Sequence, residues 1–201
     1  MTQCHFKPKN RSRKVPKATY LKLPESKKQR IYAVCKKEFS DKPFHQATVR
    51  DIVQALEIPR GSFYQYFEDL TDCYMYVLSQ ETKELHNLFI DLIQKLPLME
   101  ALEEYKHLLL KELVHNENYS LYKYRFLDWN YELSLAWKKY NHQTFVTKEP
   151  VSPMISVFKS VVHDLVYRLF AEEWDDNEFI THYDNEIAII MNGVSMSHIH
   201  H

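Results

Sequence analysis

The short run from Arg60 to Tyr66 concentrates side chains that could hydrogen-bond to nucleic acid, namely Arg60, Ser62, Tyr64, Gln65 and Tyr66. A glutamine amide can pair bidentately with adenine, and an arginine can pair with guanine or with a phosphate. Serine and tyrosine hydroxyls can donate to phosphate oxygens. In a short helix the apolar Ile58, Phe63 and Phe67 would pack inward and leave these polar side chains facing outward. The run therefore indicates recognition of DNA.

A second short helix is predicted immediately before this run, over residues 49–56. Thr48 and Asp51 have the spacing of a capping box, in which the hydroxyl accepts from an orphan N–H and the carboxylate faces the positive end of the helix. Residues 57–58 form the turn, and Pro59 follows at a first-turn position, where its missing N–H costs little. The helix would bury one apolar face, made of Val49, Ile52, Val53 and Leu56. Two helices joined by so short a turn are typical of a helix-turn-helix.

The run from Ile58 to Phe67, IPRGSFYQYF, resembles the signature of the tetracycline-repressor (TetR) family of transcriptional regulators. The second DNA-binding helix of that family carries a basic residue, Gly, Ser or Thr, an apolar residue, and then Tyr-x-Tyr-Phe. Upstream, the resemblance includes Thr48-Val49-x-Asp51-Ile52 and the apolar positions Ile31, Val34, Cys35 and Phe39, so that it covers residues 24–78. It implies that the DNA contacts are made by Thr48, Arg50, Arg60, Gly61, Ser62, Tyr64, Gln65 and Tyr66.

Two positions depart from the family pattern. Glu68-Asp69-Leu70 stands where members usually place a lysine that touches a phosphate, and Lys42-Pro43 stands where a glycine is common. Gly61, inside the second helix, has two interpretations: it lets the backbone approach DNA closely, or it allows close packing of helices.

Charge divides the chain at residue 67. Residues 1–67 hold 15 Lys/Arg against 5 Asp/Glu, a net charge of +10, whereas residues 68–201 hold 11 against 22, a net charge of -11. A positive lobe releases counterions from a polyanion and gives salt-dependent DNA affinity, while an acidic remainder stays away from phosphates. The basic half contains the predicted helix-turn-helix. The basic residues before Pro24 are expected to form an arm that adds phosphate or minor-groove contacts.

The expected fold class is all-α, with an N-terminal three-helix helix-turn-helix domain followed by a helical ligand-binding and dimerisation bundle. The sequence has only 2 glycines, which argues against Gly-rich phosphate loops and a turn-dense β protein. We expect a basic flexible arm over 1–23, the DNA-binding domain over 24–70 and the effector-binding and dimerisation domain over 71–201. Apolar spacing predicts the helices at 24–39, 49–56, 58–67, 69–96, 98–115, 119–140, 154–173 and 177–196.

No enzyme activity, cofactor or metal site is expected. The sequence has no His-Glu-x-x-His, no nucleophile elbow and no paired cysteine motif. Glu104-x-x-His107 is half of a di-iron bundle motif without its second copy, and the stripe of Glu178, His182 and Glu186 is more typical of a solvated face. Three unpaired cysteines, no visible signal peptide and no apolar run long enough to span a bilayer predict a cytoplasmic protein.

Aromatic residues are dense between 119 and 145, more than a single helix can direct into a tight core. Large rings with polar tips suit the wall of a ligand cavity or a subunit interface, although core packing accounts for many of them. The residues expected to contact a ligand are Tyr105, Tyr122, Phe126 and Trp129. The resemblance implies that the last two helices pair with their symmetry mates as a four-helix bundle, through residues that include Val161, Leu165, Leu169, Ile187 and Ile190.

The function expected from these features is a homodimeric, ligand-responsive transcriptional regulator, and more specifically a repressor. Its partners would be a double-stranded DNA operator, a second copy of the chain and an unidentified small-molecule effector. Two alternatives remain open. One is an all-helical small-molecule or metal-binding protein or enzyme, for which the sequence offers no catalytic set. The other is a regulator that acts through a protein partner, with the aromatic residues as the interaction surface.

Overall fold

The computed structural model describes residues 15–144 and 153–197, and within these ranges all regular structure is helical, as the sequence predicts. The helices are α1 (Ala18–Leu21), α2 (Glu25–Asp41), the 3-10 turn η1 (Phe44–Gln46), α3 (Val49–Leu56), α4 (Arg60–Tyr66), α5 (Leu70–Lys95), α6 (Leu98–Leu113), α7 (Tyr119–Leu127), α8 (Tyr131–Thr144), α9 (Pro153–Ala171) and α10 (Asp176–Ser197).

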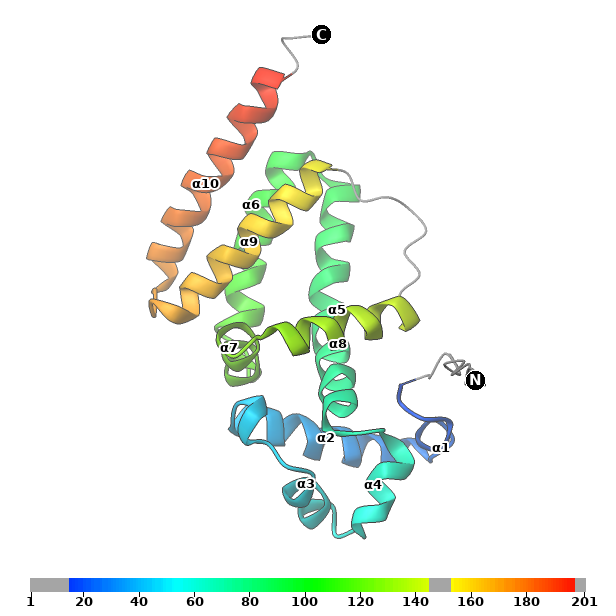
Figure 1. Ribbon diagram of the computed structural model, residues 1–201. Coiled ribbons are helices and arrows are strands. Elements are labelled where there is room, and N and C mark those ends of the chain that lie inside the picture. Colours follow the sequence, from blue (N-terminus) through cyan, green and yellow to red (C-terminus); the bar gives the residue numbers. More distant parts are fainter. Residues whose placement is uncertain (1–14, 145–152, 198–201) are drawn as a thin grey trace, which may run out of the picture.

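Two groups of helices occupy opposite ends of the molecule (Figure 1). Helices α2, α3 and α4 form one end, and the long α5 runs from them into the other, where α6 packs against α5 and α9 against α10. Helix α7 contacts both α2 and α9, and α8 packs across α5. Because α5 and α7 reach both groups, they are the elements through which one end can act on the other.

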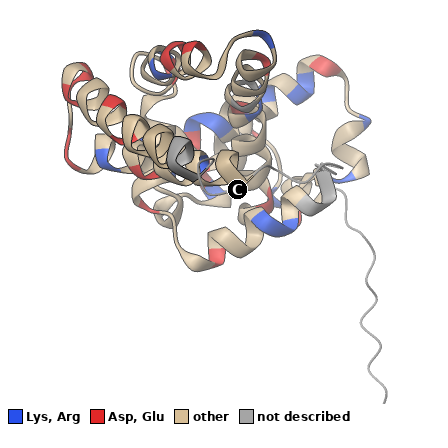
Figure 2. Ribbon diagram, turned by 90° about the horizontal axis from the view of Figure 1, so that it is seen from above, with Lys and Arg blue, Asp and Glu red and all other residues tan. Residues whose placement is uncertain are grey.

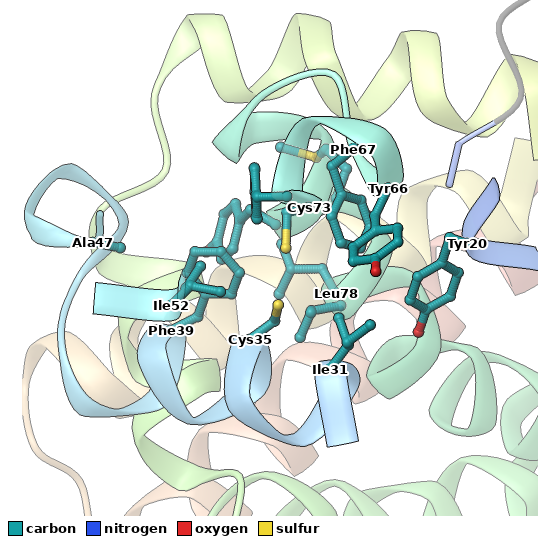
Figure 3. Close-up of a cluster of buried hydrophobic side chains, with 14 of the residues drawn as sticks. Tyr20, Ile31, Cys35, Phe39, Ala47, Ile52, Tyr66, Phe67, Cys73 and Leu78 are labelled. Carbon is teal, nitrogen blue, oxygen red and sulfur yellow. The ribbon is translucent and has the colours of Figure 1, made fainter. Parts of the chain in front are cut away.

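The N-terminal helices enclose one apolar core (Figure 3). Ile31, Cys35 and Phe39 recur along α2 at helical spacing, and all three are buried beside Ile52 of α3. Burying a large apolar side chain stabilises a fold by about 1.5–3 kcal/mol, so this face fixes how α2 and α3 pack. The sulfur atoms of Cys35 and Cys73 lie in the same core, where burial raises the pKa of Cys73 well above its usual range.

Residues 15–23 pack against α4 and α5, which corrects the expectation of a flexible arm extending to residue 23. The main-chain N–H of Lys17 donates to the carbonyl of Tyr66 at 2.9 Å. Tyr20 is 1% exposed, and its ring centroid lies 5.4 Å from those of Phe67 and Tyr76. This segment therefore belongs to the core of the DNA-binding end. Residues 1–14, with the other basic residues of the arm, lie outside the described residues.

Helix α3 begins at the predicted cap. Thr48 Oγ1 accepts from the main-chain N–H of Asp51 at 3.1 Å. The second half of the expected capping box is replaced, because the N–H of Thr48 donates to Glu38 Oε1 of α2 at 2.8 Å. The Asp51 carboxylate accepts instead from Lys42 Nζ at 2.6 Å, and this hydrogen bond lowers the pKa of Asp51. The end of α2 is thereby tied to the start of α3.

The turn between α3 and α4 passes through Glu57, whose φ of 55° lies in the left-handed region. A residue with a Cβ atom pays about 1–2 kcal/mol in this region, whereas glycine adopts it freely. The Glu57 carboxylate gains an exposed ion pair with Arg30 at 3.7 Å. Because exposed pairs contribute at most about 1 kcal/mol, the turn keeps some of its strain.

We expect Glu57→Gly to raise the free energy of unfolding by about 1 kcal/mol, because it removes the left-handed strain at a small electrostatic cost. Urea denaturation followed by circular dichroism measures the change. Gln54→Gly is the matched control, since a glycine inside α3 should lower stability by about 1 kcal/mol. A loss of stability in both variants would show that the turn at Glu57 is unstrained.

Residues 119–140 do not form the single helix predicted from the sequence. Helix α7 ends at Leu127 and α8 begins at Tyr131, and the break contains neither proline nor glycine. Asn130 Oδ1 accepts from the main-chain N–H of Leu133 at 2.9 Å, so that Asn130 starts a new helix in a new direction. The break places α8 across α5, beside α7 and not in line with it.

None of the helices in the described residues has the length and apolar content needed to cross a bilayer. Over residues 15–144 and 153–197, no three His, Cys, Asp or Glu side chains come together as a metal site. In α10, His182 instead stacks on Trp174 with ring centroids 4.1 Å apart, and Glu186 accepts a hydrogen bond from Arg168.

Candidate nucleic-acid interface and effector domain

Helix α4 presents Arg60, Tyr64 and Gln65 to solvent at the end of the molecule. Its other face is anchored by Phe63 and Phe67, which are buried with ring centroids 5.5 Å apart. Arg60 Nη2 donates to the hydroxyl of Tyr64 at 3.4 Å. The amide of Gln65 forms no hydrogen bond with any described residue, so that its donors and acceptor are free for an external partner.

Thr48 and Arg50 are exposed at the start of α3. The hydroxyl oxygen of Thr48 is used in the helix cap, but its proton remains available for an acceptor such as a phosphate oxygen. Arg50 forms no ion pair within the part of the chain that the structure describes. Both residues are therefore free to donate to a phosphate.

The outward orientation predicted for Tyr66 is wrong. Its side chain is 5% exposed and lies edge-on against Tyr20, with ring centroids 6.1 Å apart. Tyr66 follows Phe63 by three residues and precedes Phe67 by one, which places all three rings on the same face of α4. Tyr66 holds the helix in place, and Tyr64 is the tyrosine that faces solvent.

Gly61 and Ser62 complete the predicted set on α4. A Cβ atom added at Gly61 would meet no atom within 4 Å, so packing within the protomer does not require glycine there. Close approach of a DNA backbone stays a prediction for this position. Ser62 is half-buried, and its N–H donates to the carbonyl of Pro59 at 2.9 Å as α4 begins.

The sequence placed Lys17 among the basic residues of the arm but did not predict its position beside α4. Its side chain is partly exposed, forms an ion pair with Glu68 at 3.0 Å and donates to the carbonyl of Tyr64 at 2.9 Å. Asp69 caps α5, where its Oδ1 accepts from the N–H of Asp72 at 2.8 Å. A lysine just before α1 thus supplies a cation near the segment that lacks the expected one. No sequence spacing could reveal this, because 47 residues separate Lys17 from Tyr64.

The far end of the molecule is acidic. Helix α10 carries Asp and Glu residues and no Lys or Arg (Figure 2). The opposite end, formed by α1 to α4, is basic, because residues 15–67 hold 10 Lys/Arg against 5 Asp/Glu (Figure 1). A polyanion is therefore attracted to the α3–α4 end and repelled by α10.

The four aromatic residues expected to bind a ligand lie in three different places. Tyr105 packs in the C-terminal core, 4.8 Å from Phe89 between ring centroids. Tyr122 is buried and donates to the carbonyl of Glu81 at 3.1 Å, beside a cavity of about 620 Å³ between α2, α5, α6 and α7. Phe126 and Trp129 line a separate groove of about 480 Å³ between α7, α8 and α9. The structure therefore brings two of the four together.

Glu81 forms the polar junction between the two ends of the molecule. Its side chain is 11% exposed and accepts from the hydroxyl of Tyr32 and from Lys36 Nζ, which lies at 3.2 Å. Asn118 Nδ2, in the segment before α7, donates to the other carboxylate oxygen at 2.6 Å. Burial, together with the hydrogen bond to Glu81, raises the pKa of Tyr32. One carboxylate on α5 thus links α2 to the start of α7.

Most of the chain is similar in sequence to a known family of regulatory proteins. Residues 31–73 match the family described as bacterial regulatory proteins, tetR family, and residues 98–193 match the tetracyclin repressor C-terminal domain. The chain belongs to the tetracycline-repressor (TetR) family. A TetR family transcriptional regulator from Chloroflexus aurantiacus J-10-FL has a similar crystal structure, with 19% sequence identity and a TM-score of 0.48 over 90% of this chain and 91% of that chain. No curated protein matches the chain.

The two matched regions of the TetR family correspond to the two groups of helices at the ends of the molecule. The N-terminal match begins in α2 and ends in the first turn of α5, so that it contains the whole helix-turn-helix. The C-terminal match runs from the start of α6 into α10. The family resemblance drawn from the run IPRGSFYQYF is confirmed, and the chain carries a TetR family DNA-binding domain.

Three of the five residues expected to form the TetR-type dimer interface lie inside the protomer. Leu165, Leu169 and Ile187 are 0%, 4% and 4% exposed, so they stabilise the chain's own core and cannot contact a second copy without opening it. Val161 and Ile190 are half-buried at the edge of the same core. The apolar side chains that α9 and α10 leave exposed are Val157, Tyr167 and Ile189, at 52%, 46% and 70%.

Proposed function

We propose that this TetR family member is a sequence-specific repressor that binds an operator as a homodimer and is released by a small-molecule effector. The observation that carries the proposal is the solvent-facing set Arg60, Tyr64 and Gln65 on a helix whose opposite face is locked by buried rings. A glutamine without a partner among the described residues, held on a rigid helix, suits the reading of base edges.

A dimer would set the spacing between the helix-turn-helix motifs of its two protomers. A single helix-turn-helix motif buries too little surface to specify a DNA site alone. Two motifs about 34 Å apart can enter successive turns of the major groove. Val157 and Ile189 support such pairing, because they leave apolar area exposed on the last two helices. An effector that binds better to a dimer with a different spacing lowers operator affinity by that difference in binding energy.

We expect the two classes of DNA contact to separate by mutation. Gln65→Ala should reduce discrimination at one base pair by about 1–3 kcal/mol, and Arg50→Ala should weaken binding to all duplexes and lower the salt slope by about 1. A duplex is first selected from a randomised pool with the full chain. Fluorescence anisotropy then compares that duplex with a scrambled one at several salt concentrations.

Lys138→Ala, an exposed lysine on α8, is the control for loss of a positive charge. It should leave binding to both duplexes unchanged. Selection of no duplex from the pool, or unchanged binding by the triple variant of Arg60, Tyr64 and Gln65 to alanine, would refute the proposal.

A further inference from the structure

The groove between α7, α8 and α9 contains an arginine, Arg125, that has no counter-ion among the residues that the structure describes. The guanidinium carbon of Arg125 lies 3.3 Å from the ring centroid of Trp129 and 5.6 Å from that of Phe126. Arg125 forms no ion pair and no side-chain hydrogen bond with any described residue. Loss of water lowers the pKa of Arg125 to about 10, so that the group is still charged at neutral pH. A partly desolvated cation is unfavourable until an anion pairs with it.

A second cation stands on the α9 side of the groove. Lys159 also has no ion pair within the described residues, and His163 lies between it and α7, with its ring 5.7 Å from Phe126. Loss of water, followed by the charges of Arg125 and Lys159, lowers the pKa of His163 to about 4, which leaves the imidazole neutral. The acidic residue of the lining, Asp164, is already paired with Arg168 Nε at 2.8 Å. Within residues 15–144 and 153–197, the partly buried Arg125 and the exposed Lys159 therefore have no ion-pair partner.

The walls of the groove are flat and aromatic. Trp129 and Trp137 meet edge to face with ring centroids 6.5 Å apart, and Tyr167 is 46% exposed on α9. Such surfaces pack well against a planar ring. A volume of about 480 Å³ falls within the range of about 300–1,000 Å³ that is usual for small-molecule sites.

The larger cavity beside Tyr122 lacks this unpaired charge. Both of its lysines are paired, Lys36 with Glu81 at 3.2 Å and Glu117 at 3.1 Å, and Lys28 with Glu25 at 3.2 Å. An anion entering it would have to displace these carboxylates, whereas Arg125 has no carboxylate partner in the described part of the chain. The smaller groove is therefore the better site for a charged ligand.

We propose that the α7–α8–α9 groove binds a planar aromatic anion, whose carboxylate pairs with Arg125 and Lys159 and whose ring lies against Trp137 and Tyr167. This assignment rests on the proposed function, since it names the chemical class of the effector. The positive charges of Arg125 and Lys159 disfavour a cationic ligand. An inorganic anion would leave the aromatic walls uncovered.

The groove also has a packing connection to the DNA-binding end. The charge of Arg125 acts on Tyr74 of α5, where it lowers the pKa that burial raises. The ring of Tyr74 lies 4.9 Å from Phe39 of α2 and 4.8 Å from Phe44 of η1, the turn that leads into α3. Neutralising Arg125 with a ligand therefore changes the electrostatics beside a residue that supports the helix-turn-helix.

Isothermal titration calorimetry on the full chain tests the ligand class with three probes. The probes are 2-naphthoate, the saturated anion cyclohexanecarboxylate and the aromatic cation 2-naphthylmethylamine. We expect 2-naphthoate to bind at least about 10-fold more tightly than the other two, because it alone uses both the charges and the rings. No binding of 2-naphthoate at millimolar concentration, or equal binding of the amine, would overturn the assignment.

Two variants test the residues. Arg125→Gln should weaken 2-naphthoate binding by about 10- to 100-fold and Lys159→Gln by about 3- to 10-fold, since hydrogen bonds to charged groups are stronger than neutral ones. Lys138→Gln, which removes an exposed charge of α8 outside the groove, should leave affinity unchanged. Arg125→Gln should melt at or above the wild-type temperature, because it removes an unpaired cation. Wild-type affinity in both groove variants would overturn the assignment.

A parallel measurement separates this inference from the proposed function. The selected duplex is titrated with the chain in the presence and absence of saturating 2-naphthoate. If 2-naphthoate binds through Arg125 but DNA affinity does not change, the groove assignment stands and release of the operator by this ligand fails. If no duplex is bound at all, the repressor proposal fails while the calorimetric result still decides the groove.

Discussion

Tyr20→Ala is expected to lower the free energy of unfolding by about 3–5 kcal/mol, the range found when a buried aromatic side chain is truncated. The ring of Tyr20 contacts the rings of Tyr66, Phe67 and Tyr76, and its hydroxyl donates to the carbonyl of Lys28 at 3.2 Å. Its removal leaves a cavity where α1, α4 and α5 meet. DNA affinity should fall with stability, because the end of α4 loses its support.

Two control variants separate the ring from its surroundings. Tyr20→Phe keeps the ring but removes the hydrogen bonds to Lys28 and from Tyr76, and should cost about 1–2 kcal/mol. Leu21→Ala changes the neighbouring exposed residue of α1 and should cost less than about 0.5 kcal/mol. Urea denaturation gives all three values. Equal stability of Tyr20→Ala and Leu21→Ala would show that residues 15–23 are a passive tail.

Glu81→Ala should destabilise the chain by about 3–5 kcal/mol, because it leaves the hydroxyl of Tyr32 and the amide of Asn118 without their acceptor and leaves the half-buried Lys36 with only an exposed partner. Lys36, Tyr32 and Asn118 all donate to this carboxylate, and they come from α2 and from the segment before α7. The variant should also weaken the link between the two ends of the molecule. We therefore expect broader or separated unfolding transitions, measured by calorimetry.

Glu117→Ala is the matched control for Glu81→Ala. Glu117 pairs with the same lysine, Lys36, at 3.1 Å, but its side chain is 81% exposed. An exposed pair of this kind contributes at most about 1 kcal/mol. If the two variants lost the same stability, burial of Glu81 at the junction would have no energetic importance.

The helix-turn-helix could be predicted from sequence because its signals are local. Thr48 caps α3, the apolar spacing from Val49 to Leu56 defines its buried face, and the turn falls at residue 57. Tyr66 shows the limit of that reasoning, since its polar tip suggested exposure while its spacing from Phe63 indicated burial. The spacing was the better guide, because a phenol ring buries far more apolar area than its hydroxyl costs once hydrogen-bonded.

Longer-range features were beyond sequence reasoning for a different reason. Helix α9 carries apolar residues on more than one face, and the sequence does not state which face meets the chain's own core and which meets solvent or a partner. Leu165 and Val157 are both apolar, yet one is fully buried and the other is 52% exposed. The break at Asn130 did have a local signal, an N-cap residue three positions before Leu133. It was obscured by the continuous aromatic pattern on either side.

The separation of basic and acidic ends gives the molecule an electric dipole along its long axis. A field from a polyanion exerts a torque on such a dipole, so the chain turns its α3–α4 end toward DNA before any contact forms. In the proposed dimer the dipole moments of the two protomers add, because both helix-turn-helix motifs lie on the same side of the dimer. Orientation during diffusion then raises the association rate constant. Added salt should lower this association rate constant more than it raises the dissociation rate constant.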